Sequence, residues 1–268
     1  MLVNPIKTRV LLPPKDDLYE VLDASLPRLR ERDVVVVTSK VVSIGEGRCI
    51  PISTPREKKK LIECEADYLA RFPENRRTLF SIKGHAIVGS AGIDESNSNG
   101  YWTLWPQDPF KSAKELWSYL RKEHRVDKLG VIISDSTSPP MRLGCTGISI
   151  GFFGLHPLLR YMGKPDIFGR LFKFERSNLV DGIAAAAVLA IGEGDEQTPI
   201  AIVRDVPTLR FVPYDTRNEL LIPPKQDIYY PILKKIYDQK RRYTQIKTQS
   251  NADTNAKVYT ARGRQSGR

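Results

Sequence analysis

The run D-V-V-V-V-T-S-K at residues 33–40 constrains the fold more than any other feature of this 268-residue chain. Four consecutive valines are typical of a buried β-strand, because β-branched side chains pack well in a sheet. The run L-G-V-I-I-S at residues 129–134 has the same character, and it is followed directly by Asp135. The sequence therefore predicts a buried sheet with polar residues where its strands end: Thr38, Ser39 and Lys40 after the first, Asp135 after the second.

Helical and strand patterns alternate along the rest of the chain. Apolar residues at spacings of three and four predict helices over 55–71, from 109 onward, over 178–190 and over 228–243. The expected N-caps include Thr54 or Ser53, Asp108, and Asn178 or Ser177. Further strands are expected over 82–88 and 200–203. Mixed helices and strands in this order indicate an α+β fold.

The charge of the chain is concentrated at one end. The net charge of +11 suggests nucleic acid, but residues 239–268 hold eight basic residues and one acid. That segment is also rich in polar residues, so we expect residues 1–238 to form the domain and residues 239–268 to be a disordered basic tail. The remaining charge is ordinary for an enzyme, and we expect no nucleic-acid partner.

Several cellular contexts are disfavoured by the sequence. The longest apolar runs are too short to cross a bilayer, and residues 1–5 do not resemble a signal peptide. Three cysteines without a C-x-x-C pair argue against a disulfide scaffold and for a reducing compartment. We therefore expect a cytoplasmic protein with no membrane association.

Three acidic positions lie where regular structure gives way to small residues. Asp94 occurs in A-G-I-D-E-S-N, Asp135 in V-I-I-S-D-S, and residues 192–196 read G-E-G-D-E. Such carboxylates suit a hard cation such as Mg²⁺ or Mn²⁺, which prefers oxygen ligands and leaves positions open for phosphate. Each acid taken alone is more often a solvated turn residue. The chain has no P-loop, no Rossmann glycine pattern opening a helix and no nucleophile elbow.

The order of seven short motifs is more informative than any single one. The chain contains, in order, T-S-K-V-V-S-x-x-E-G-R, A-G-I-D-x-S-N, L-x-P-x-D-P, G-V-I-I-S-D-S, R-x-G-x-x-G-x-x-I-G, G-x-x-D-x-x-G-R and G-E-x-D-E. In this it resembles the coenzyme F420-0:L-glutamate ligase family, the γ-glutamyl ligases, over roughly residues 9–204. The resemblance implies a two-lobed α+β body of mixed sheets with flanking helices, and an intertwined homodimer.

The resemblance also implies a reaction and its residues. A nucleoside triphosphate, usually GTP, with ATP as the alternative, would drive amide formation between an acceptor carboxylate and L-glutamate through an acyl phosphate. Two divalent cations, Mg²⁺ or Mn²⁺, would hold the phosphates. The positions carried over are metal ligands Asp94, Asp135, Ser136 and Glu193, nucleotide contacts Ser39, Lys40, Asn97, Gly192, Gly194, Asp195 and Glu196, and catalytic cations Lys40 and Arg142.

The chain departs from the family pattern near these residues. Ile44 replaces a nucleotide-contacting lysine, and Ser138, Pro139 and Met141 replace glycine, arginine and tryptophan. Loss of an arginine is better tolerated with a folate-like acceptor than with F420-0, which carries a phosphodiester, so folate is the favoured acceptor of the two. The alternative from another class is a degenerate binding protein that kept the fold and lost catalysis. The acceptor, the choice between GTP and ATP, and the number of glutamates added stay open.

Overall fold

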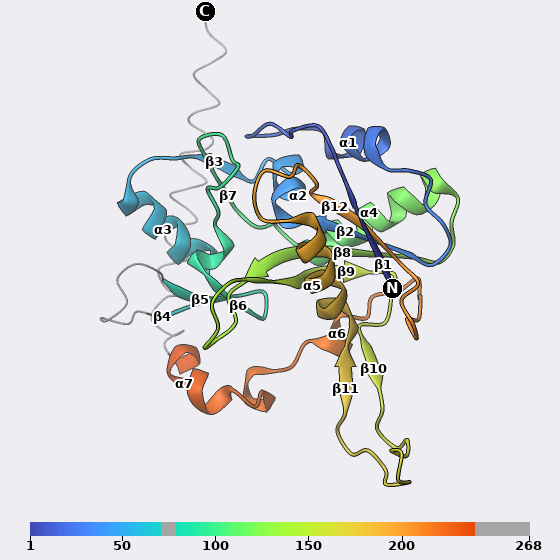
Figure 1. The fold of residues 1–268 in the computed structure, drawn as a ribbon. Coiled ribbons are helices and arrows are strands. Elements are labelled where there is room, and N and C mark those ends of the chain that lie inside the picture. The colour runs from blue at the N-terminus through green and yellow to red at the C-terminus, as the bar shows by residue number, and fades with distance from the viewer. Residues whose placement is uncertain (71–78, 239–268) are drawn as a thin grey trace, which may run out of the picture. The chain divides into compact units, whose positions relative to one another are not determined.

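A computed structural model describes residues 1–70 and 79–238 (Figure 1). The chain divides into two compact units, one formed by residues 1–52 and 93–221 and the other by residues 53–92 and those from 222 onward. Helices and several sheets occur together, so the expected α+β fold is confirmed. The tail at 239–268 lies outside the described residues. Among the described residues, no helix combines the length and apolar character needed to span a bilayer.

The first unit is built on a mixed five-stranded sheet. Its strands lie in the order β1 (Leu2–Ile6), β12 (Ile200–Arg204), β2 (Asp33–Thr38), β8 (Leu129–Thr137) and β9 (Thr146–Phe153). Strands β2 and β8 are parallel, and the other neighbouring pairs are antiparallel. The valines of β2 are fully buried, which means that both faces of the sheet are covered. The prediction of two buried strands is therefore confirmed.

Helices pack on this sheet, and the hydrophobic core lies between them and the strands. Helix α5 (Leu179–Ile191) buries Val180, Ile183 and Ala187 against alternate residues of the strands, including Val34 and Val36. Helix α4 (Pro109–His124) packs against β8 and β9, where Trp117 meets Phe153 edge to face. Glycines permit the close approach of strand and helix: a Cβ at Gly147 would lie 2.5 Å from the Ala184 carbonyl oxygen.

Shorter elements complete the first unit. Helix α1 (Leu18–Ser25) and helix α2 (Ser39–Gly45) flank the sheet, and α6 (Arg217–Leu220) is a single turn. Two antiparallel ribbons pair β3 (Cys49–Pro51) with β7 (Tyr101–Thr103) and β10 (Leu158–Arg160) with β11 (Arg176–Asn178). The β10–β11 ribbon projects away from the five-stranded sheet and ends in a long loop (Figure 1).

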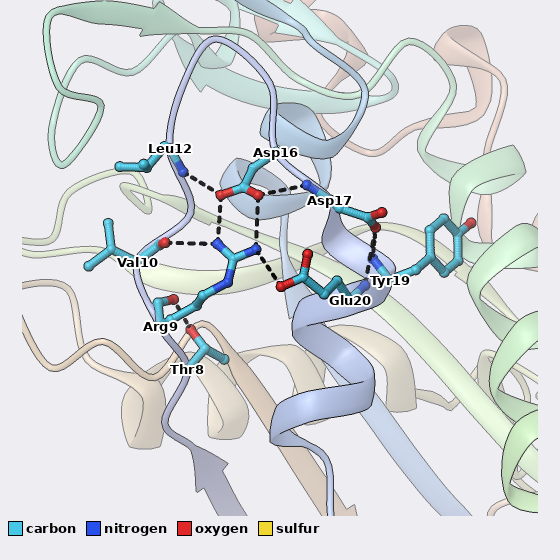
Figure 2. Close-up of polar contacts among 8 residues, drawn as sticks. All are labelled: Thr8, Arg9, Val10, Leu12, Asp16, Asp17, Tyr19 and Glu20. Carbon is cyan, nitrogen blue, oxygen red and sulfur yellow. Dashed lines mark hydrogen bonds and ion pairs between the residues drawn. The ribbon is translucent and has the colours of Figure 1, made fainter.

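A cluster of charged groups fixes the segment between β1 and α1 (Figure 2). The Arg9 guanidinium makes two hydrogen bonds to the Asp16 carboxylate, at 2.7 and 3.0 Å, and a longer one of 3.4 Å to Glu20. The backbone N–H groups of Leu12 and Asp17 also donate to Asp16. The hydrogen bonds from Arg9 hold the pKa of Asp16 well below its usual range, so this carboxylate is charged in all but strong acid.

The second unit contains a three-stranded antiparallel sheet of β4 (Tyr68–Ala70), β5 (Phe80–Lys83) and β6 (Ala86–Gly89). Helix α3 (Pro55–Glu65), helix α7 (Tyr230–Asp238) and the short 3₁₀ turns η1 (Ser90–Gly92) and η2 (Pro224–Gln226) belong to it. Leu233 and Ile236 of α7 pack with Ala70 and Ile82 of the sheet. Residues distant in the sequence thus share this small core.

The expected helix starts are confirmed by their caps. The Asp108 carboxylate accepts the N–H groups of Phe110 and Lys111, and the Asn178 side chain accepts that of Asp181. Thr54 and Glu57 form a reciprocal capping box at the start of α3.

Several expected boundaries are wrong. The strand from Asp33 ends at Thr38, and residues 39–45 form a helix whose apolar side chains are buried. The strand expected over 82–88 is a hairpin that turns at Gly84 and His85, both at positive φ. The helix expected over 55–71 stops at Glu65, before β4. Of the helix expected over 228–243, residues 228 and 229 form a turn, residues 230–238 are helical, and residues 239–243 lie outside the described residues.

Candidate active site

The site lies where the parallel pairing of β2 and β8 ends. Asp135 was expected to follow its strand, but it lies within β8, because pairing with β9 extends this strand to Thr137. Thr38 stands opposite Ser134 in the register, so Ser39 and Asp135 follow at the same edge of the sheet. The Ser39 hydroxyl forms a hydrogen bond with the Asp135 carboxylate. Ligands bind beyond the carboxyl ends of parallel strands because loops there leave polar groups free to converge.

Lys40 connects this edge to the loop that contains Asp94. Its ammonium lies 2.7 Å from Asp94 Oδ2 and donates to the carbonyl and hydroxyl oxygens of Ser96, at 2.6 and 2.9 Å. The Ser96 N–H donates to Asp94 Oδ1 and the Ser96 hydroxyl to Oδ2. Burial raises the pKa of Asp94, but the hydrogen bond and charge of Lys40 outweigh it, so the pKa is below its ordinary value.

Asp135 is held by donors from three segments. The indole N–H of Trp105, the backbone N–H of Ser136 and the Ser39 hydroxyl all donate to its carboxylate. Burial and, to a smaller extent, the neighbouring negative charge of Asp94 nevertheless raise the pKa of Asp135 to about 6. Asp94 and Asp135, 41 positions apart in the chain, therefore act on each other electrostatically.

The loop after α5 joins the same site. The Asn97 amide donates to the Gly194 carbonyl oxygen at 2.8 Å, linking the loops that hold Asp94 and Glu193. Glu196 folds back to accept the Gly194 N–H at 2.8 Å. Gly192, at φ +85°, lies so close that a Cβ there would be 2.3 Å from Glu196 Cδ. Asn97 and Glu196 thus shape the loop.

The other acids of this loop differ in their surroundings. Glu193 accepts a long hydrogen bond of 3.5 Å from the thiol of Cys145, which precedes β9. Asp195 is exposed. Both carboxylates are available to a ligand that approaches the loop.

Arg142 lies apart from these contacts. It is in the exposed segment between β8 and β9, between Met141 and Leu143, whose side chains are fully exposed. Ser136, by contrast, is within β8, opposite Gly147. A cavity of about 540 Å³ lies elsewhere, among α1, α2 and α4, and none of the predicted site residues lines it.

The residues at this edge fit a divalent cation that would complete its ligand set with phosphate. Within residues 1–70 and 79–238, no three His, Cys, Asp or Glu side chains form a ready metal cluster. Two mutually repelling carboxylates are present, and a cation bound by both would relieve that repulsion. Mg²⁺ is commonly bound through one or two carboxylates plus substrate phosphates, which matches this donor set.

Two contributors were missed by sequence reasoning. Ser96 makes four of the contacts that fix Lys40 and Asp94, and its place in I-D-x-S-N was a signal that could have found it. Trp105 occupies an unspecified position of L-x-P-x-D-P, so no sequence signal pointed to it.

The molecule is thus an α+β protein with a charged site where the parallel pairing of its two buried strands ends. The family within that class follows from comparison with known proteins. The F420-0:Gamma-glutamyl ligase family matches residues 5–205, and the chain belongs to that family. It is a ligase of the kind that forms amide bonds.

Proteins named coenzyme F420:L-glutamate ligase are similar to this chain over most of its length. The protein from Methanopyrus kandleri is 32% identical, over 85% of this chain and 96% of its own length. The protein from Methanosarcina mazei is 31% identical, over 66% of this chain and 75% of its own. The protein from Methanothermobacter thermautotrophicus is 30% identical, over 75% of this chain and 86% of its own length.

Proposed function

We propose that this ligase joins L-glutamate to a carboxylate of F420-0, using a nucleoside triphosphate, GTP with ATP as the alternative, and a divalent cation, Mg²⁺ or Mn²⁺. The observation that carries the proposal is the convergence of Lys40, Asp94, Asn97 and Asp135 at one edge of the sheet. The names of the relatives supply the acceptor and the amino acid.

The chemistry requires an activated acyl group, because a carboxylate does not react with an amine directly. An oxygen of the acceptor carboxylate attacks the γ-phosphorus, the bond between the γ-phosphorus and the bridging oxygen breaks, and the nucleoside diphosphate leaves. The amine of L-glutamate then attacks the acyl carbon. The new C–N bond forms, inorganic phosphate leaves, and the amine loses a proton to solvent. Charge on the transferring phosphoryl group must be stabilised throughout.

The residues of the site have separate roles in this reaction. Asp94 and Asp135 would hold the cation, which neutralises phosphate charge, with Ser136 and Glu193 as further oxygen donors. Lys40 and Ser39 would contact the nucleotide phosphates, and the loop of Gly192, Gly194, Asp195 and Glu196 would border the nucleotide with Asn97. Arg142 would be the second positively charged catalytic side chain beside Lys40, and its exposed segment leaves it accessible to a substrate.

A folate-type acceptor is the second candidate. Pro139 and Met141, where the family pattern has arginine and tryptophan, lie beside Arg142 in the exposed segment before β9. Proline provides neither a charge nor a backbone N–H for an anionic acceptor, and folate demands less of that charge than F420-0 does.

We further propose that the enzyme is a homodimer. The loop of the β10–β11 ribbon carries apolar side chains that are almost fully exposed: Ile167 at 92%, Phe168 at 89% and Phe174 at 82%. A two-stranded ribbon alone is only marginally stable, and exposed apolar groups of this kind mark interaction surfaces. A second copy of the chain would cover them.

Mass spectrometry tests the proposed reaction. The full chain is incubated with L-glutamate, Mg²⁺ or Mn²⁺, GTP or ATP, and either F420-0 or dihydrofolate. We expect an acceptor product one glutamyl residue heavier, formed in step with nucleoside diphosphate, and no product from Asp135→Asn. Absence of product from both acceptors, with the acceptor still bound, would instead support a binding protein that has lost catalysis.

A further inference from the structure

Trp105 is the least expected member of the site. Its side chain is 2% exposed, and its indole N–H donates to Asp135 Oδ2. The motif L-x-P-x-D-P leaves this position open, so the family resemblance assigns it no role. A buried tryptophan normally finds a partner for its N–H, but a carbonyl oxygen would satisfy it equally well. Here the partner is one of the two central carboxylates.

Hydrogen bonds also hold the backbone around Trp105. Arg48 Nε donates to the Trp105 carbonyl oxygen at 3.1 Å, and the Leu104 N–H donates to the Arg48 carbonyl oxygen at 3.0 Å. The indole N–H is therefore presented from a segment held on both sides. A rigid donor fixes the direction in which the acceptor carboxylate points.

The donors on Asp135 limit how it can bind a cation. An ionised carboxylate has about four lone-pair positions. Trp105, the Ser136 N–H and the Ser39 hydroxyl occupy three of them. A carboxylate held this way offers a cation a single oxygen. Ca²⁺ favours six to eight oxygens, often with both oxygens of one carboxylate, whereas Mg²⁺ and similar small cations accept single carboxylate oxygens.

We propose that Trp105 is a positioning residue that holds Asp135 as a one-oxygen ligand and thereby favours Mn²⁺ or Mg²⁺ over Ca²⁺. This inference rests on the proposed function, because it takes Asp135 as a cation ligand. It assigns the selectivity for the cation to a side chain that does not itself touch the cation.

Cation binding to the full chain, measured without acceptor and both with and without GDP, tests this. Free Mn²⁺ is measured by electron paramagnetic resonance, and Ca²⁺ is added as competitor. Trp105→Phe keeps a ring but removes the donor. Removing a group that hydrogen-bonds to a metal ligand typically weakens metal affinity about 10–100-fold. We therefore expect a Mn²⁺ affinity lower by that factor and a preference for Mn²⁺ over Ca²⁺ at least several-fold smaller.

Two further variants separate positioning from packing. Trp105→His restores a ring N–H and should recover part of the Mn²⁺ preference even if the smaller ring lowers stability. Trp117→Phe is the matched control, since this buried indole donates to the Leu129 carbonyl oxygen, away from Asp135. It should bind both cations as the wild type does.

The outcomes distinguish this inference from the proposed function. If the wild type binds Mn²⁺, Asp135→Asn abolishes binding, and Trp105→Phe matches the wild type in affinity and preference, the role of Trp105 is refuted while the site stands. If the wild type binds no Mn²⁺ up to millimolar concentration, either alone or beyond the Mn²⁺ that GDP itself binds, both are refuted.

Discussion

Lys40 and Asp94 show how single residues of this site depend on each other. The ammonium of Lys40 is surrounded by three oxygens, one from Asp94 and two from Ser96. A hard metal cation would bind to oxygens of the same kind. Without a cation, Lys40 neutralises Asp94. In the proposed complex with a metal and phosphates, the ammonium would turn to the phosphates and would serve as a counterion in both states.

Removing this ammonium should have opposite effects on two ligands. We expect Lys40→Met to bind Mn²⁺ about two- to fivefold more tightly than the wild type, because an ion pair worth up to ~1 kcal/mol no longer competes for Asp94. Nucleotide binding should weaken, since a phosphate contact is lost. Titration calorimetry measures both. Lys111→Met, which removes an exposed helix lysine paired with Glu115, is the control. Weaker Mn²⁺ binding by Lys40→Met would contradict the competition.

At the scale of elements, the loop after α5 depends on one glycine. Gly192 caps the end of the helix at φ +85°, and a Cβ at this position would clash with the Glu196 side chain. Gly192→Ala should lower the free energy of unfolding by about 1–3 kcal/mol, because an L-residue is strained there and its Cβ displaces Glu196. Denaturant titration measures the change.

A second glycine in the same element provides the control. Gly182 lies within α5, and a Cβ there would meet no atom within 4 Å. Gly182→Ala should raise the free energy of unfolding by about 0.5–1 kcal/mol. Equal or greater stability of Gly192→Ala would show that the loop does not need glycine at that position.

Elements with strong local signals could be predicted from the sequence, and the others could not. The valine run and the capped starts of α3, α4 and α5 all have local physical causes. Helix α2 could not be predicted, because Val41 and Val42 favour a strand and only burial against the sheet makes them helical. The hairpin turns at Gly84 and His85, whereas the strongest hairpin signals are Asn-Gly and Asp-Gly. Trp105 joins the site only through tertiary structure, which no local pattern contains.

At the scale of the whole molecule, we predict that the basic end of the chain is separable from the chemistry. The predicted site residues all lie between Ser39 and Glu196, and residues 239–268 have too few apolar side chains to build a core. Truncation after Asp238 should leave kcat/KM for the ligation nearly unchanged. A loss beyond about tenfold in a folded truncated protein would show that the tail takes part in the reaction.

We propose that Asp94 and Asp135, from different elements, bind one cation beside a nucleotide. Anomalous diffraction from crystals grown with Mn²⁺ and GDP would show such a cation. We expect a Mn²⁺ peak within about 2.0–2.6 Å of a carboxylate oxygen of each residue, with the diphosphate next to it. A peak bound by neither carboxylate, or a nucleotide bound away from Lys40 and Asn97, would contradict it.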